Sequence, residues 1–201
     1  MKGARPEPAQ PVPAARGDGS PSKNRKGLVI VFTGNGKGKT TAAMGLALRA
    51  SGNKMRVRVI QFIKGSWKTG EVEAVKPLAP LFEIVRAGLG FTIDRLRDPR
   101  IEPDEHRAAA QAGLEEARQS IVSGDFAIVV LDEILGAIKA RLVTTEQVLD
   151  LVDAKPPMLH LVLTGRDAPA EIVEAADLVT EMRLIKHPFQ MGIIAQRGIE
   201  F

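Results

Sequence analysis

Eight consecutive residues early in the chain have the types and spacing needed to bind phosphate. They lie between an apolar run that ends at Phe32 and a segment of helical composition. Glycines let the backbone bend and direct its N–H groups at an anion, and a following helix adds its positive end. In such a loop Lys39 reaches a phosphate and the Thr40 hydroxyl is a ligand for Mg²⁺. We expect a nucleotide to contact Gly34, Asn35, Gly36, Lys37, Gly38, Lys39, Thr40 and Thr41.

The loop departs in one place from the common phosphate-binding pattern G-x-x-x-x-G-K-[ST]. That pattern has its leading glycine where this chain has Thr33, so the first glycine, Gly34, comes one residue late. The end of the pattern, from Gly38 to Thr40, is complete. A glycine-rich turn without a ligand is the alternative, and the strand-like and helix-like flanks favour the phosphate loop.

Two carboxylates, Asp132 and Glu133, form a second group of candidate site residues. They end an apolar run that begins at Ala127. A buried strand delivers such acids to the carboxyl edge of a sheet, where they hold Mg²⁺ directly or through water. Alone the pattern is weak, because strands also end in an acid that caps a helix. With the loop, it predicts a metal site made by Thr40, Asp132 and Glu133.

Strand-like and helix-like segments that could position these residues alternate from residue 27 onward. Apolar runs predict strands at Leu28–Phe32, Arg56–Phe62, Phe82–Arg86, Phe126–Leu131, His160–Leu163 and Leu178–Arg183. Helical patterns predict helices at Lys39–Ser51, Glu71–Lys76, Pro103–Val122, Glu133–Arg141, Thr145–Asp153 and Pro169–Ala175. The order indicates an α/β fold of the P-loop NTPase (RecA-like) kind. We expect an open, mainly parallel sheet of about six strands with helices on both faces, and a ligand at its carboxyl edge.

Composition limits the kind of protein. With 201 residues and 44% hydrophobic content, the chain can bury one substantial core. It has no cysteine, which excludes disulfides, thiolate nucleophiles and Cys-ligated zinc. No apolar run approaches the roughly 20 residues that span a bilayer, and no signal peptide is evident. These features predict a cytoplasmic protein without membrane contact.

The basic charge is concentrated at the N-terminus. Residues 1–26 contain six basic and two acidic side chains, which accounts for the formal net charge of +4. The same residues are rich in proline, a composition that resists helix and core formation. We therefore predict a flexible, proline-rich basic tail at residues 1–26, a domain at residues 27–201, and no nucleic-acid partner.

Several nucleotide chemistries fit less well. The N-K-x-D motif with which regulatory GTPases read guanine is absent, and the chain has length for one domain where a helicase needs two. Small-molecule kinases often close an arginine-rich lid over the phosphates, which Arg95, Arg97 and Arg100 could imitate. A solvated loop of mixed charge is an equally good interpretation of that cluster.

Seven segments, in order along residues 27–201, are similar to those of the ATP:corrinoid adenosyltransferases of the CobA/BtuR type. They are residues 31–43, 59–65, 90–92, 130–133, 163–166, 175–183 and 195–201. The late leading glycine is also a trait of that family. The resemblance implies transfer of the 5′-deoxyadenosyl group of ATP to the cobalt of a reduced, Co(I) corrinoid, with release of triphosphate. It also implies a place in cobalamin biosynthesis or salvage, a homodimer and a flavodoxin-like reductant.

Under this resemblance Lys39, Thr40 and Glu133 are the catalytic residues. They would stabilise, with Mg²⁺, the charge that develops on the leaving triphosphate. Phe91 would pack against the corrin and keep a lower ligand from the cobalt, although Ile93 stands where many relatives have Trp. Packing of Phe91 onto the core is the alternative.

Other residues are ambiguous. Arg166 follows a strand at the binding edge, so a phosphate contact and a salt bridge are equally plausible. Trp67 either covers the nucleotide or corrin or anchors a loop. Arg49 is expected at the surface of its helix. His106, His160 and His187 show no ligand spacing and are expected to be hydrogen-bonded structural or surface residues.

Two other functions remain open from the residues. In an ordinary ATPase, Glu133 would activate water and the γ-phosphate would be cleaved. In a corrinoid chaperone, the chain would bind nucleotide and pass its cargo to a dependent enzyme. Product identity separates transferase from ATPase, and retention of product until a partner arrives would indicate the chaperone.

Overall fold

A computed structural model describes residues 25–64, 69–90 and 100–200, and six strands of this part form one open sheet. The strands are β1 (Val29–Thr33), β2 (Val57–Gln61), β3 (Phe82–Arg86), β4 (Ile128–Asp132), β5 (His160–Thr164) and β6 (Leu178–Glu181). Their order is β3-β2-β4-β5-β1-β6 and every pairing is parallel. The predicted open α/β fold with about six strands is therefore confirmed.

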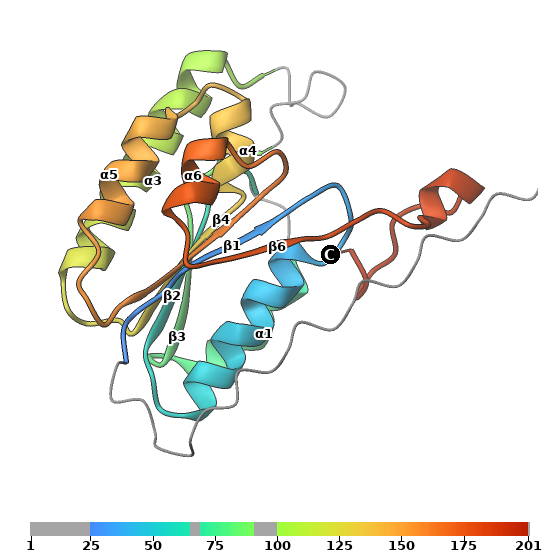
Figure 1. The fold of residues 1–201 in the computed structure, drawn as a ribbon. Coiled ribbons are helices and arrows are strands. Elements are labelled where there is room, and N and C mark those ends of the chain that lie inside the picture. The colour runs from blue at the N-terminus through green and yellow to red at the C-terminus, as the bar shows by residue number, and fades with distance from the viewer. Residues whose placement is uncertain (1–24, 65–68, 91–99, 201) are drawn as a thin grey trace, which may run out of the picture.

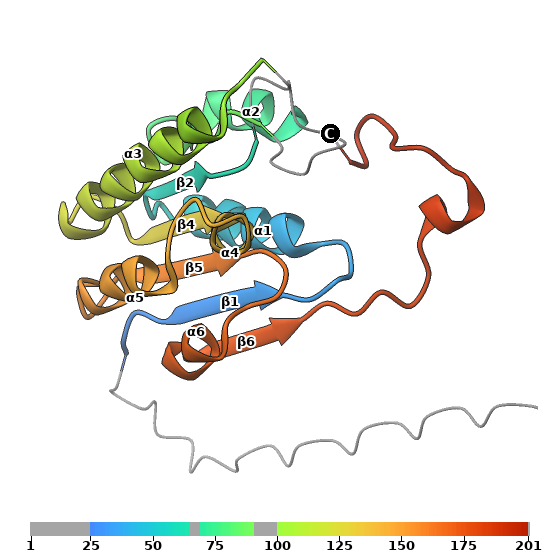
Figure 2. The same cartoon turned by 90° about the horizontal axis from the view of Figure 1, so that it is seen from above.

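Helices cover both faces of this sheet. They are α1 (Lys39–Gly52), α2 (Gly70–Val75), α3 (Pro103–Val122), α4 (Ile134–Lys139), α5 (Thr145–Asp153) and α6 (Ala170–Ala175), with short 3₁₀ helices η1 (Lys76–Leu78) and η2 (Pro188–Met191). Figures 1 and 2 show α1 on one face and α3, α4, α5 and α6 on the other. The buried apolar side chains divide in the same way into two clusters, one on each side of the sheet.

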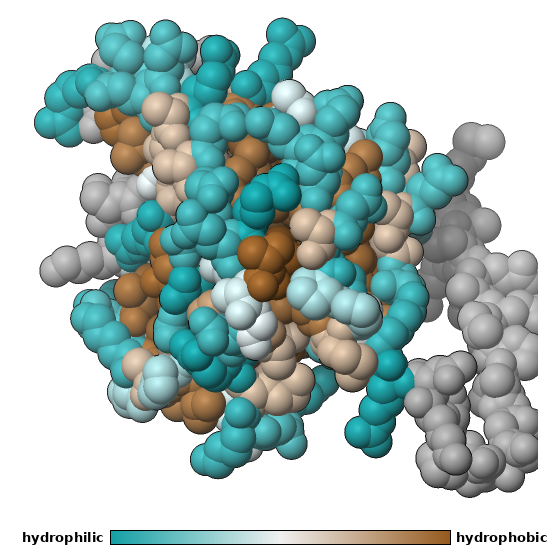
Figure 3. Space-filling model, turned by 90° about the vertical axis from the view of Figure 1, so that its left-hand side faces the viewer, coloured by the Kyte–Doolittle hydropathy of each residue, from teal (hydrophilic) through white to brown (hydrophobic). Residues whose placement is uncertain are grey.

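The sequence explains these layers. All five residues of β4 are buried, as expected for a parallel strand covered on both faces. In α1 the buried positions facing the sheet include Ala43, Ala47 and Ala50, whose small side chains let the helix approach closely. The outer faces of the helices are mostly polar, with a few exposed apolar side chains such as Leu48 of α1 and Val122 of α3. Figure 3 shows mostly hydrophilic side chains, with small apolar patches, on the side where α3 and α5 lie.

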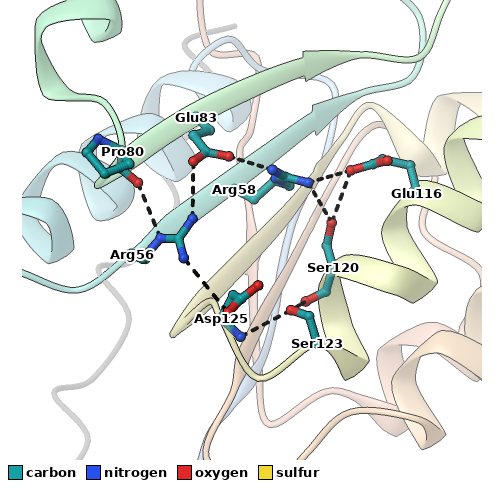
Figure 4. A network of polar contacts seen from close by, with 8 residues as sticks. All are labelled: Arg56, Arg58, Pro80, Glu83, Glu116, Ser120, Ser123 and Asp125. Atoms are coloured by element: carbon teal, nitrogen blue, oxygen red, sulfur yellow. Dashed lines mark hydrogen bonds and ion pairs between the residues drawn. The ribbon is translucent and has the colours of Figure 1, made fainter.

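A polar network joins β2 and β3 to α3 near the amino ends of the strands (Figure 4). Arg58 donates hydrogen bonds to Glu83 and to Glu116, and Arg56 also pairs with Glu83. Both guanidinium groups lie over the Phe126 ring, at 4.9 Å for Arg56 and 4.5 Å for Arg58. These contacts stabilise the end of the sheet opposite to the glycine-rich loop.

Predicted and observed boundaries differ by a few residues. The helix expected from Glu133 begins at Ile134, because Glu133 is its N-cap residue in the left-handed conformation with φ 60°. The last strand, expected to reach Arg183, ends at Glu181. The short helices η1 and η2 were not predicted.

Residues 1–24 lie outside the described part, so the flexible tail and the domain boundary after residue 26 stay predictions. Among the helices of the described residues, none combines the length and the apolar character needed to cross a bilayer.

Candidate functional site

The glycine-rich loop, residues 34–38, connects the carboxyl end of β1 to α1. Its residues 35–38 line a cavity of about 510 Å³, whereas Gly34 is not on the wall of that cavity. Gly38 is the N-cap of α1 in the left-handed conformation, and no side chain of the described residues caps the helix. The N–H groups of the first turn of α1 are therefore not used by a capping side chain. An uncapped helix start at the edge of a cavity is suited to bind an anion.

The side chain of Lys39, the first residue of α1, points back to the backbone of the glycine-rich loop. Its ammonium donates hydrogen bonds of 2.8 Å to the carbonyl oxygens of Gly34 and Gly36. The residue is 7% exposed and lines the cavity. Burial lowers the pKa of Lys39, while the negative charge of Glu133 acts in the opposite direction. The lysine thus fixes the loop and offers its charge to the cavity.

Asp132, at the end of β4, accepts hydrogen bonds from two hydroxyl groups and is not itself exposed on the wall of the cavity. Thr40 and Thr164 both donate to its Oδ1 at 2.8 Å, and the backbone N–H of Glu133 donates to the Thr164 hydroxyl at 2.9 Å. Asp132 is 1% exposed. Because the Thr40 proton points to Asp132, the lone pairs of the Thr40 oxygen remain available to a cation.

Glu133 follows Asp132 and lines the cavity. Burial raises the pKa of the Glu133 carboxyl, and the charge of Asp132 adds to this effect. The hydroxyl of Thr40 and the carboxylate of Glu133 therefore border one cavity. Hard oxygen donors of this kind are what Mg²⁺ prefers.

A cation held here would also need oxygens that the described residues do not supply. Among them no group of three or more His, Asp or Glu side chains is arranged to hold a metal ion. This donor set fits Mg²⁺, which usually keeps water and substrate phosphate oxygens among its ligands.

An ion pair that the sequence did not indicate lies beside Asp132 and lines the same cavity. Lys64 forms an ion pair of 2.5 Å with Glu71 in α2, and its ammonium is 3.8 Å from Asp132. Gln61, fully buried at the end of β2, donates weakly to both acids at 3.4 Å. Lys64 lies in one of the segments that resembled the family, but nothing in its spacing indicated an ion pair.

The departure at Thr33 has a structural explanation. The Thr33 hydroxyl accepts a hydrogen bond of 3.2 Å from the backbone N–H of Ala168, which ties β1 to the loop after β5. Gly34 then provides the left-handed turn, with φ 94°. The backbone of Met182 runs beside the loop and accepts the Gly36 N–H at 2.6 Å. The loop therefore starts one residue later without losing its turn.

We expect Gly34→Ala to destabilise the protein, by about 1 to 3 kcal/mol if the strained backbone persists. A Cβ there would lie 2.5 Å from the carbonyl oxygen of Met182, in a backbone conformation that L side chains rarely adopt. Thermal unfolding measures the change. Gly45→Ala is the matched control, because no atom of the described residues lies within 4 Å of its added Cβ. A Gly34 variant as stable as the Gly45 variant would contradict the expectation.

The other candidates are distributed as follows. Asn35, Lys37, Thr41 and Arg166 line the cavity, and within the described part Arg166 has no ion pair, so the structure gives no support for its salt-bridge alternative. Phe91, Ile93, Trp67, Arg95 and Arg97 lie outside the described residues. Arg100 is exposed before α3 and Arg49 is exposed on α1, as expected for the latter.

The histidines are mostly as expected. His160 Nδ1 accepts the backbone N–H of Leu28, and His187 Nδ1 accepts that of Phe189. His106 is buried, but its Nε2 has no hydrogen-bond partner in the described part of the chain, so the expectation of a hydrogen-bonded histidine is wrong at that atom. His187 lines the cavity, which its sequence position did not indicate.

The charges around the cavity suit a polyanion accompanied by a cation. Among the described residues, its wall contains four basic side chains (Lys37, Lys39, Lys64 and Arg166) and three acidic ones (Glu71, Glu133 and Glu200). Together with the uncapped start of α1 at the carboxyl edge of a parallel sheet, they define an open α/β protein with a candidate nucleotide site.

Comparison with known proteins identifies the family. The family model for ATP:corrinoid adenosyltransferase BtuR/CobO/CobP matches residues 25–201. The chain belongs to this family of transferases, which take ATP and a corrinoid as substrates.

Several curated relatives cover most of the chain. A corrinoid adenosyltransferase of Pseudomonas aeruginosa is 41% identical over 183 residues, with 90% of this chain and 86% of the relative covered. One from a Sinorhizobium species is 43% identical, with 89% and 82% covered. One from Escherichia coli is 36% identical over 180 residues, with 90% and 88% covered.

Proposed function

We propose that this chain transfers the 5′-deoxyadenosyl group of ATP to the cobalt of a reduced, Co(I) corrinoid and releases inorganic triphosphate. In this reaction cobalt supplies the electron pair that attacks the ribose 5′ carbon. The bond between that carbon and its phosphate oxygen breaks, and its electrons leave with the triphosphate. Neither a protein nucleophile nor a water molecule takes part.

One observation carries this proposal. In a chain that belongs to this family, the uncapped start of α1, Lys39 and Glu133 all border the same cavity. Charge develops on the leaving triphosphate, and donors fixed before the reaction stabilise it without having to reorganise. Lys39 is already fixed by its two loop carbonyls. The loop and the helix start would hold the phosphates and orient the ribose carbon toward the corrinoid.

Thr40 and Glu133 would hold Mg²⁺, with Asp132 fixing the Thr40 hydroxyl. When bound, the ion neutralises charge on the phosphate oxygens. Arg166, which is exposed at the rim of the cavity, would add a further positive charge for the triphosphate.

One reaction tests the proposal. The protein is mixed with MgATP and chemically reduced cobalamin, and the new cobalt–carbon bond is followed by absorbance. Formation of an adenosylcorrinoid together with an equal amount of triphosphate is the expected result. Absence of the cobalt–carbon bond under these conditions would overturn the proposal.

The proposal also covers the compartment, the oligomeric state and the electron donor of the enzyme. We infer a cytoplasmic homodimer that takes its electron from a flavodoxin-like reductant and acts in cobalamin biosynthesis or salvage. The family membership supports this inference. Gel filtration and reduction assays with a flavodoxin test it.

Phe91 provides a separate prediction. If its side chain excludes the lower ligand from cobalt, Phe91→Ala should slow the reaction that starts from cob(II)alamin and a reductant far more than the one from preformed cob(I)alamin. Ile93→Trp, which adds the aromatic ring common in relatives, should be neutral or faster. Equal slowing from both starting states would make Phe91 a packing residue instead.

A further inference from the structure

The C-terminal arm, residues 182–200, follows β6 and is not part of the sheet. Figures 1 and 2 both show it leaving the carboxyl edge, carrying η2 at its far point and turning back toward the molecule. Its apolar side chains are largely exposed, with Ile185 at 89% and Ile194 at 80%. The arm is therefore not held in place by a core of its own, so its contacts with the loop decide its position.

The beginning of the arm is attached to the glycine-rich loop. The Met182 N–H donates to the Thr33 carbonyl at 2.8 Å, and the Met182 carbonyl accepts the Gly36 N–H at 2.6 Å. The contact is close enough that a Cβ on Gly36 would lie 2.7 Å from the Met182 oxygen. The first residues of the arm thus form one side of the loop.

The end of the arm returns to the same loop. Glu200 Oε1 accepts a hydrogen bond of 3.0 Å from the Lys37 ammonium, and Glu200 Oε2 accepts the Gln196 N–H at 2.9 Å. The Glu200 N–H in turn donates to the Gln196 carbonyl at 2.9 Å, which closes a turn. The turn places Gly198, Ile199 and Glu200 on the wall of the cavity.

This wall differs chemically from the loop side. Ile199 is 64% exposed although it borders the cavity, and among the described residues Met44 of α1 is the other large apolar side chain on the lining. The Glu200 carboxylate repels phosphate and already neutralises Lys37. The triphosphate is therefore favoured near Lys39 and the start of α1, and an uncharged, flat group is favoured beside Ile199.

We propose that the turn at residues 196–200 receives the nucleoside part of ATP, with Ile199 and Met44 contacting the adenine. This inference rests on the proposed function, because it takes ATP as the ligand. Ile199 is then a specificity-determining residue for the nucleotide, and the arm completes a site whose other walls come from the sheet edge.

Equilibrium binding separates the two parts of the ligand. Isothermal titration calorimetry with MgATP and with magnesium and inorganic triphosphate is carried out on the full chain. Ile199→Ala should raise the Kd for ATP by about tenfold, because an apolar contact with the base is lost. The Kd for triphosphate should not change. Removal of residues 195–201 should likewise raise the ratio of the Kd for ATP to the Kd for triphosphate.

Ile194→Ala is the matched control. Ile194 lies on the same arm and is 80% exposed, but it is not on the cavity wall, so neither constant should change. Because Ile199 is exposed, its truncation should also leave the melting temperature unchanged. If Ile199→Ala weakened ATP and triphosphate equally, or weakened neither, the inference would be wrong.

The comparison of binding constants can be made whether or not the protein transfers the adenosyl group. A wild-type protein that binds ATP but forms no adenosylcorrinoid would overturn the proposed function and leave this comparison of binding constants intact. A wild-type protein that is active, with an unchanged ATP constant in the Ile199 variant, would overturn this inference alone.

Discussion

Lys39→Ala should weaken ATP binding and lower the rate of adenosyl transfer by about 100-fold or more, the cost of removing a donor that stabilises charge in the transition state. The structure places the ammonium inside the loop, where burial has already removed much of its hydration. Its interaction with developing negative charge is therefore stronger than that of an exposed lysine. Calorimetry with MgATP and steady-state rates with Co(I) corrinoid measure the two effects.

The same variant also loses the two hydrogen bonds to Gly34 and Gly36, so its fold needs a check by thermal unfolding. Lys139→Ala is a suitable control. Lys139 is an exposed lysine of α4 that pairs with Asp167 and does not line the cavity. It should bind ATP and react as the wild type does. A Lys39 variant of near wild-type activity would refute the assignment of the loop to phosphate.

Glu133→Gln should decrease the formation of triphosphate and of adenosylcorrinoid in parallel, by at least about tenfold, because the metal site loses a charged ligand. In a transferase the carbon is attacked by cobalt, so Glu133 has no water to activate. ATP should then be stable in the absence of corrinoid. Phosphate analysis by chromatography, with and without reduced cobalamin, measures both products.

An ordinary ATPase would behave differently. A water-activating Glu133 would release ADP and phosphate without any corrinoid, and the substitution would abolish that release. Glu174→Gln, an exposed change on α6, controls for the loss of a carboxylate elsewhere. Steady ADP production by the wild type without corrinoid would overturn the transferase reading.

The fold could be predicted because its signals are local. The runs that became β4 and β5 are apolar almost throughout, which is typical of parallel strands buried on both faces. In α3, buried residues recur with helical spacing, and Pro103 marks the first helical position. The left-handed conformation of Glu133 was not visible in this way, because it depends on how β4 turns into α4 beside the cavity.

The site could be predicted where its residues directly follow strands of the sheet. The loop and the pair Asp132 and Glu133 follow strands, so the topology alone brings them to one edge. The partner of Lys37 is Glu200, which is 163 positions away in the chain, and no periodicity indicates such a contact. The ion pair between Lys64 and Glu71 at the cavity was not predicted for a related reason. It depends on how α2 packs beside the end of β2.

The strand order affects how the protein can fold during its synthesis on the ribosome. Of the strands in the described part of the chain, β1 is synthesised first, yet its two neighbours in the sheet, β5 and β6, are synthesised last. A ribosome adding roughly 5 to 20 residues per second needs on the order of 10 s to pass from β1 to β6. During that time the strand that carries the glycine-rich loop lacks both of its hydrogen-bonding neighbours. The nucleotide site therefore cannot form on a nascent chain, and ATP can assist folding only after synthesis is nearly complete.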